Sequence, residues 1–325
     1  ACTESRHMTA YEVGPADEFV YVVGATGGQY CRNGYYDPPP TFMDEWTRSI
    51  LYLPSTDRLS DAVVIYDRVS ARDPRDLPKF DRYYAPEQNA VIAADGKKQW
   101  FVHMPVQPAV TSTTITWQTA GGQNVRVNTL LPSDNVKEIF DETVTGIPGY
   151  HQTSEEKWRV RLTPGAEREW DTFLNVVQAF DGAGDANIAL VQASAGEAQG
   201  VHMTDRAGGD VLVVFNSQWA GRLTAPPYTG LTDAALNAAR LHKQGYTVQW
   251  SCQTSPTKAY LMDLDPSASW FASVDGGAQN PLTVSPRGIA RLTVSGSGPR
   301  NIVVTKSGPA PLDVTTTSLP NGVQG

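Results

Sequence analysis

Asp17-Glu-Phe-Val-Tyr-Val-Val-Gly24 opens a series of strand-like segments that decides the fold. The later members are equally short and rich in β-branched and aromatic residues, and they occupy 48–53, 62–69, 98–105, 158–164 and 173–177. Turn signals made of Gly, Pro and Asp separate the segments at intervals of roughly ten to twenty residues. This pattern favours an all-β protein built as a large antiparallel β-sandwich of the supersandwich kind.

Two further segments, 111–117 and 125–131, alternate between two faces, as strands with one solvated side do. One short surface helix is expected within 232–245, because Thr232 or Asp233 can cap its start and Gly245 can end it. Segment 167–180 places its large apolar residues at helical spacing, so periodicity leaves helix and strand both open there. We expect an N-terminal arm over 1–15, one sandwich over 16–306 and a flexible tail rich in Pro and Thr over 307–325.

The composition is that of a folded, turn-rich β protein. Of the 325 residues, 40% are hydrophobic and 18% are charged, and the formal net charge is -8. A negative average field repels polyanions, so nucleic acid is not an expected partner. No stretch approaches the roughly 18 apolar residues that a bilayer crossing needs, so no membrane span is expected.

The cysteine content leaves the redox state open. Cys2, Cys31 and Cys252 permit one bridge and one free thiol, or no bridge at all. The low-charge composition rich in Thr, Ser and Gly resembles that of exported bacterial proteins, so we expect a secreted, periplasmic or extracellular location, where Cys2 and Cys31 could pair. The first ten residues have no apolar core of a signal peptide, so a mature form or an excised fragment is expected.

Taken in order, the strand segments resemble the C-terminal β-sandwich of the heparinase II/III-like polysaccharide lyases over residues 10–305. The resemblance makes 173–177 a strand. In that family an N-terminal α/α toroid packs against the sandwich, and the two bind an acidic polysaccharide such as heparan sulfate or alginate. The bond is cut by β-elimination, in which a base removes the C5 proton while other groups neutralise the uronate carboxylate.

The toroid that supplies Asn, His and Tyr groups to that reaction has no counterpart in this sequence. The resemblance therefore implies a carbohydrate-facing or partner-docking module, served by a helical toroid domain or by a self-assembly partner, that does not perform β-elimination alone. The alternative is a structural or assembly protein of an extracellular or surface complex, built on the same sandwich and joined to neighbours by strand addition at its termini.

A metal ion is a further implication of the resemblance, because the sandwich of the family commonly holds one. Asp67 of Tyr66-Asp-Arg-Val69 and His103 of Phe101-Val-His-Met104 stand where two ligands of a zinc or calcium ion are expected. A closed zinc site takes four ligands, and Gln29-Tyr-Cys-Arg32 offers no histidine where another is sought. The structural alternative is that Asp67 caps a strand end and His103 is a hydrogen-bonded histidine of the sandwich.

Catalysis by the sandwich alone would require Tyr66, Arg68 and His103 to converge in one cleft. Sugar rings stack on exposed aromatic side chains, so substrate contacts are expected from aromatic residues in Pro-rich and charged loops. These residues are Tyr35, Tyr36, Trp46, Tyr83 and Tyr84. Ordinary partial burial is the alternative for this group.

Overall fold

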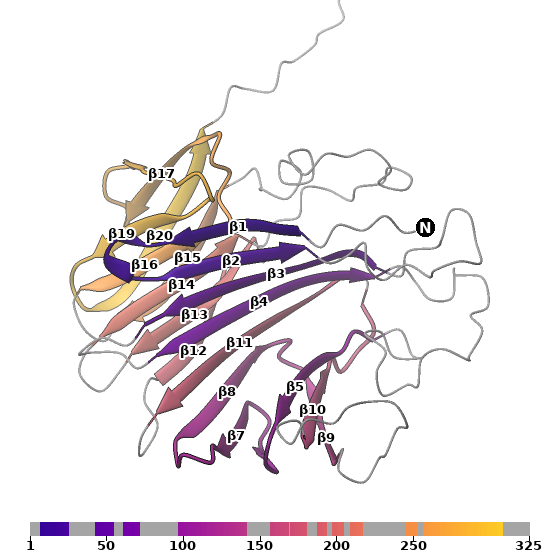
Figure 1. The fold of residues 1–325 in the computed structure, drawn as a ribbon. Coiled ribbons are helices and arrows are strands. Elements are labelled where there is room, and N and C mark those ends of the chain that lie inside the picture. The colour runs from indigo at the N-terminus through magenta and orange to yellow at the C-terminus, as the bar shows by residue number, and fades with distance from the viewer. Residues whose placement is uncertain are drawn as a thin grey trace, which may run out of the picture.

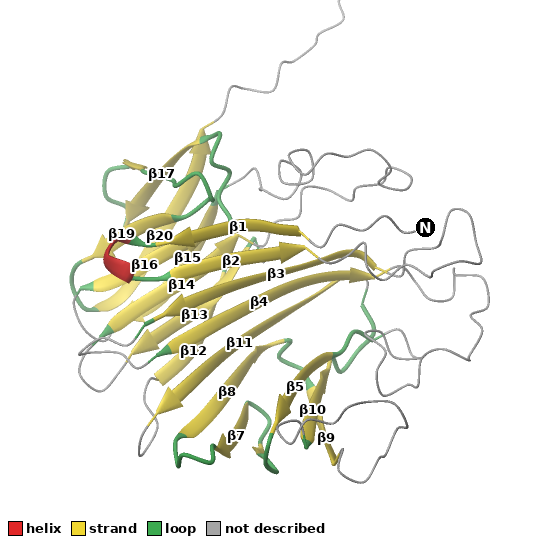
Figure 2. Ribbon diagram, in the orientation of Figure 1, coloured by secondary structure: helices red, strands yellow, loops and turns green. Residues whose placement is uncertain are grey.

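The structure is a computed structural model that describes residues 7–25, 43–54, 61–71, 97–141, 157–168, 170–180, 187–193, 197–204, 209–216, 245–252 and 256–307. These residues form twenty strands and one 3-10 turn, Pro15–Asp17, so the predicted all-β fold is confirmed (Figure 2). The helix expected within 232–245 lies outside the described residues, except for Gly245. Among the residues described, no helix has the length and apolar character needed to cross a membrane.

The strands form four sheets (Figure 1). The eight-stranded sheet has the order β1-β2-β3-β4-β11-β8-β7-β6, with bounds β1 His7–Val13, β2 Val20–Ala25, β3 Met43–Leu53, β4 Ala62–Ala71, β11 Trp170–Phe180, β8 Asn124–Leu131, β7 Thr114–Gln118 and β6 Ala109–Val110. The three-stranded sheet has the order β5-β10-β9, with bounds β5 Trp100–Met104, β10 Trp158–Thr163 and β9 Val136–Asp141.

The other two sheets come mainly from the second half of the chain. The five-stranded sheet has the order β12-β13-β14-β16-β19, with bounds β12 Asn187–Gln192, β13 Ala198–Thr204, β14 Asp210–Asn216, β16 Thr257–Met262 and β19 Ala290–Val294. The four-stranded sheet has the order β15-β20-β17-β18, with bounds β15 Tyr246–Cys252, β20 Gly298–Ser307, β17 Ser269–Val274 and β18 Asn280–Leu282.

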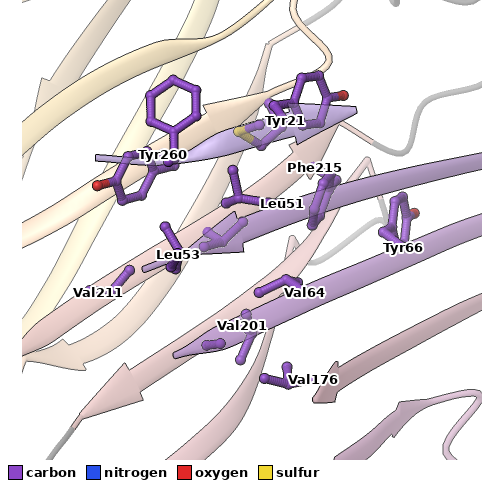
Figure 3. Packing of buried hydrophobic residues seen from close by; sticks show 14 of the residues in the cluster. Tyr21, Leu51, Leu53, Val64, Tyr66, Val176, Val201, Val211, Phe215 and Tyr260 are labelled. Carbon is purple, nitrogen blue, oxygen red and sulfur yellow. The ribbon is translucent and has the colours of Figure 1, made fainter. Parts of the chain in front are cut away.

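Three apolar clusters join the four sheets into a stack of layers. In the first cluster, Leu51 and Val64 of the eight-stranded sheet pack with Val201 and Phe215 of the five-stranded sheet (Figure 3). The second cluster lies between the five-stranded and four-stranded sheets, and the third lies between the eight-stranded and three-stranded sheets. The layers therefore follow the order three-stranded, eight-stranded, five-stranded and four-stranded. The five-stranded sheet and the central strands β4, β11 and β8 of the eight-stranded sheet are covered on both faces.

Double coverage explains why the sequence of two strands does not alternate. Every residue of β14 is buried, because this strand is central in an inner sheet, and it pairs antiparallel with β13 and parallel with β16. In β11, Leu174 and Val176 enter the first cluster while Phe173 enters the third. Large apolar residues on both faces of one strand produced the helical spacing of 167–180, and residues 170–180 are a strand.

The pairing of β13 with β14 depends on a glycine without space for a side chain. A Cβ atom on Gly200 would lie 2.0 Å from the backbone oxygen of Val213. Gly24 in β2, by contrast, has space for a side chain, since a Cβ atom there would meet nothing within 4 Å.

We predict that Gly200→Ala lowers the free energy of unfolding by about 1–3 kcal/mol, as overpacking of a buried site does. Gly24→Ala is the matched control, and it should be neutral or stabilising by up to about 1 kcal/mol, because Ala loses less backbone entropy on folding. Urea unfolding followed by tryptophan fluorescence measures both values. Equal stability of the two variants would contradict the close approach of β13 and β14.

Candidate functional site

Tyr66 and Arg68, two residues with predicted catalytic roles, lie inside the stack. They share the face of β4 that packs against the five-stranded sheet, and both are buried. The ring of Tyr66 stacks on Phe215 with 4.8 Å between centroids, and its hydroxyl donates to Gln199 Oε1 at 2.8 Å. Neither side chain opens to a cleft that could admit a polysaccharide.

Arg68 belongs to a buried polar group that we call the Asp263 junction, formed by Tyr21, Arg68, Asn216 and Asp263. Arg68 Nη1 donates to Asp263 Oδ2 at 3.1 Å and to the backbone oxygen of Asn216 at 3.0 Å. The hydroxyl of Tyr21 donates to Asp263 Oδ1. Asp263 directly follows β16 and has a φ of 59°, in the left-handed region that non-glycine residues seldom adopt.

The Asp263 junction links two of the four sheets. Tyr21 and Arg68 come from the eight-stranded sheet, and Asn216 and Asp263 come from ends of strands in the five-stranded sheet. Burial, together with the charge of Asp263, raises the pKa values of Tyr21 and Tyr246. Both phenols therefore remain neutral at physiological pH, and neither is a general base.

Asp67 and His103, the residues predicted to bind a metal, are not brought together. Asp67 is buried on the other face of β4, where its two carboxylate oxygens accept from Nε and Nη2 of Arg48, each at 2.7 Å. His103 is exposed on β5. Trp100 and Met104 face the eight-stranded sheet, so strand alternation places His103 on the other face of β5. Within the described part of the chain no group of three or more His, Cys, Asp or Glu residues could hold a metal ion.

Of the five aromatic residues predicted to bind substrate, only Trp46 lies within the described residues. Trp46 is half-buried beside the third cluster, and the guanidinium of Arg48 lies 5.6 Å from its ring centroid. Tyr35, Tyr36, Tyr83 and Tyr84 lie outside the described residues, as do Cys2 and Cys31. Cys252 is buried in β15, and its Sγ lies 3.0 Å from Thr257 Oγ1.

An open cleft of about 550 Å³, which the sequence did not predict, lies where the hairpin of β1 and β2 meets the edge of the five-stranded sheet. We call it the Glu18 cleft. Its polar lining includes Glu12, Glu18, Lys258, Tyr260, Ser285 and Arg291. Residues from the two ends of the chain therefore meet in one site.

Glu18 is the centre of the cleft. Its Oε1 accepts from Lys258 Nζ at 3.1 Å and from the hydroxyl of Tyr260 at 3.0 Å, and its Oε2 accepts from Arg291 Nη1 at 2.8 Å. Partial burial alone would raise the pKa of Glu18, but these three hydrogen bonds outweigh burial and hold the pKa below its ordinary value. Burial and the charge of Glu18 raise the pKa of Tyr260, which therefore acts as a neutral donor.

The rest of the lining adds further hydrogen-bonding groups. Ser285 Oγ donates to Glu12 and accepts from the backbone N–H groups of Arg287 and Ile289, each at 3.2 Å. The side chains of Lys258 and Arg291 are exposed, so their remaining N–H donors reach the solvent in the cleft. Donors, acceptors and fixed charges of both signs thus converge on one open space.

Comparisons with known proteins give limited matches. No protein-family model matches the sequence, and no curated protein matches it either. Among solved structures, the heparan sulfate lyase HepC from Pedobacter heparinus is 12% identical with a TM-score of 0.40, and the match covers 65% of this chain and 28% of that lyase. A heparinase III is 11% identical with a TM-score of 0.39, covering 64% of this chain and 27% of that protein. The chain therefore spans little more than a quarter of the length of these lyases.

We predict that Asp263→Asn lowers the free energy of unfolding by about 3–5 kcal/mol, because it leaves the buried charge of Arg68 uncompensated. The double variant Arg68→Met with Asp263→Asn should recover part of this loss, since no charge is then left unpaired. Glu138→Ala, which removes an exposed ion-pair partner, is the control and should cost at most about 1 kcal/mol. Chemical unfolding measures all three, and a loss for Asp263→Asn no larger than that of the control would contradict the junction.

We also predict that Glu18 makes the docking of the β1–β2 hairpin dependent on pH. Because its folded pKa is depressed, Glu18 contributes stability that is fully present above its ordinary pKa of 4.5 and is lost as pH falls through the folded value. Glu18→Gln should therefore be less stable than the wild type at pH 7, and the difference should vanish at acid pH. Urea unfolding between pH 7 and pH 3 measures it, and a difference that does not change with pH would contradict the role of this carboxylate.

Proposed function

We propose that this chain is a carbohydrate-facing β-sandwich module of a heparinase II/III-like polysaccharide lyase, and that it does not perform β-elimination alone. The family part of the proposal rests on the ordered strand motifs in the sequence. The Glu18 cleft is the observation that carries the carbohydrate part, because it is open, polar and lined by groups that can bind a ligand rich in hydroxyls. Secretion and a helical toroid partner belong to the same proposal.

The lining of the Glu18 cleft suits a sugar in two respects. Saccharide hydroxyls both donate and accept hydrogen bonds, and the cleft offers N–H donors on Lys258 and Arg291 together with carboxylate acceptors on Glu12 and Glu18. Apolar faces of sugar rings also need apolar surface, which Leu292 and its neighbours supply at the same cleft. The two cations and two carboxylates balance, so the cleft can accept a neutral or weakly acidic sugar.

The arrangement of ionisable groups supports a role without independent catalysis. β-Elimination needs a base at the C5 proton and a cation at the uronate carboxylate in one cleft. Tyr66 and Arg68 are buried between two sheets, while His103 lies exposed on a third. In the Glu18 cleft, the raised pKa of Tyr260 suits a hydrogen-bond donor better than a base.

We predict that the purified chain binds oligosaccharides without cleaving them. Lys258→Gln should weaken binding by about tenfold, since a hydrogen bond to a charged group contributes roughly 1.5–3 kcal/mol. Arg287→Gln removes the same charge from an exposed position near the cleft, and it should leave the affinity unchanged. Isothermal titration calorimetry with alginate and heparan sulfate oligomers measures the affinities, and absorbance of the unsaturated product detects cleavage.

Two results would overturn the proposal. Equal weakening by Lys258→Gln and Arg287→Gln would mean that charge near the cleft, and not the cleft itself, governs binding. Robust turnover by the isolated chain would show that it is a complete lyase.

One observation favours the alternative function, a structural or assembly protein. Within the described residues β1 is the last strand of the eight-stranded sheet, and its side chains Met8, Tyr11 and Val13 are exposed. An exposed apolar edge strand is suited to pairing with a neighbouring chain. Light scattering after size exclusion separates the two functions, because a monomer at every concentration removes the alternative.

A further inference from the structure

The outer face of the three-stranded sheet carries alternating arginine and phenylalanine side chains. Val160 and Leu162 of β10 face the eight-stranded sheet, so strand alternation directs Arg159 and Arg161 to the opposite face. Their cross-strand partners on this face are Phe101 and His103 in β5 and Glu138 and Phe140 in β9. We call the set Phe101, Arg159, Phe140 and Arg161 the Arg–Phe ladder.

The rings hold the guanidinium groups in place. The Cζ atom of Arg159 lies 5.0 Å from the ring centroid of Phe101 and 5.0 Å from that of Phe140, and Arg161 Cζ lies 4.9 Å from Phe140. All three distances fall within the roughly 6 Å range of cation–π attraction. A guanidinium stacked on a ring uses its flat faces, so its N–H groups, which lie in the plane, stay directed at its edges.

Arg161 has more donors than its neighbours on this face accept. Its Nη2 donates to Glu138 Oε2 at 2.6 Å, while its Nε is buried and has no hydrogen-bond partner among the residues described. Arg48 shows how the same fork is filled in this protein, because its Nε and Nη2 together bind both oxygens of Asp67. The fork of Arg161 is therefore only half-filled by Glu138.

The surroundings of Arg161 favour an incoming anion. The side chain of Arg161 is 17% exposed and that of Glu138 is 49% exposed, so the ion pair between them is open to solvent and weak. His103, also exposed, is the cross-strand partner of Arg159 on the same face. In a chain with a net charge of -8, Arg159 adds a second positive charge beside Arg161 on this face.

We propose that the Arg–Phe ladder is an oxyanion-binding site, distinct from the Glu18 cleft, in which a carboxylate or sulfate group takes the fork of Arg161 in competition with Glu138. The planar fork of an arginine matches both groups, since each presents two oxygens at the required spacing. Such a group comes either from an acidic saccharide or from a free ion. Only the saccharide source rests on the proposed function.

The test follows the Nε–H NMR signal of Arg161 in the full chain labelled with ¹⁵N. Sodium sulfate, an acidic alginate oligomer and a neutral oligomer of equal length are titrated separately. Sulfate and the acidic oligomer should move the Arg161 signal, and the neutral oligomer should not. The acidic oligomer should bind more weakly as sodium chloride is added, because the contact is ionic.

Variants on the ladder give opposite changes. Glu138→Gln removes the competing carboxylate and should strengthen anion binding by about two- to fivefold, the range that a surface ion pair spans. Arg161→Gln should abolish binding, and Arg161→Lys, which keeps the charge but loses the fork, should restore little of it. Arg300→Gln is the matched control for the ladder, because Arg300 is 20% exposed, pairs through Nη1 with Asp275 at 2.6 Å and also has a buried Nε without a hydrogen-bond partner among the described residues, but lies on the four-stranded sheet.

Each outcome decides between the sites. Unchanged or weaker binding in Glu138→Gln overturns the proposal, and a misfolded variant cannot mimic the expected gain. If Lys258→Gln abolishes binding of the acidic oligomer while Arg161→Gln does not, the cleft is the site and the ladder is not. If sulfate moves the Arg161 signal but no oligomer binds, the oxyanion site stands, its ligand is a free ion, and the carbohydrate function fails.

Discussion

One buried carboxylate, that of Asp263, ties the eight-stranded sheet to the five-stranded sheet. An ionised carboxylate inside a protein is stable only when charged and hydrogen-bonding groups compensate for the water it has lost. Arg68 and Tyr21 supply this compensation, and both reach across from a different sheet. The charge therefore ties the eight-stranded sheet to the end of β16, in addition to the apolar contacts of the first cluster. Asp263 presents its carboxylate to these partners from a left-handed backbone conformation, which is energetically unfavourable for a residue other than glycine.

Because of this layered arrangement, both candidate binding sites lie at an edge or on an outer layer of the stack. Strand β4 is covered on both faces, so Tyr66 and Arg68 are buried in the interior although their residue types suit catalysis. The Glu18 cleft forms where a hairpin of one layer meets the edge of the next, and the Arg–Phe ladder forms on an outer layer. The two sites are built differently, because one gathers charges of both signs around a cleft and the other places arginines between phenylalanine rings on one face of a sheet.

The sequence predicted the fold class well, because runs of β-branched and aromatic residues between Gly and Pro turns have few other uses. It could not say which faces are covered. Tyr66-Asp-Arg-Val69 shows why: alternation sends Tyr66 and Arg68 to one core and Asp67 to Arg48 on the opposite face, so neighbours in the motif do not share a site. For the same reason, the sequence could not decide between helix and strand for 167–180, because a strand buried on both faces no longer alternates between apolar and polar residues. The Glu18 cleft escaped notice because no short motif joins Glu18 to Lys258 and Arg291, and only sheet packing brings them together.

Contacts between residues near the start of the sequence and residues beyond position 250 also set an order for folding. Tyr21 is 242 positions from Asp263, and Glu18 is 273 positions from Arg291. A ribosome adds residues from the N-terminus onward, so β1 and β2 emerge long before the strands they must meet. Contacts of such high sequence separation form slowly, because loop closure costs entropy before any contact repays it. The hairpin of β1 and β2 therefore cannot make these contacts until β16 and β19 have been synthesised.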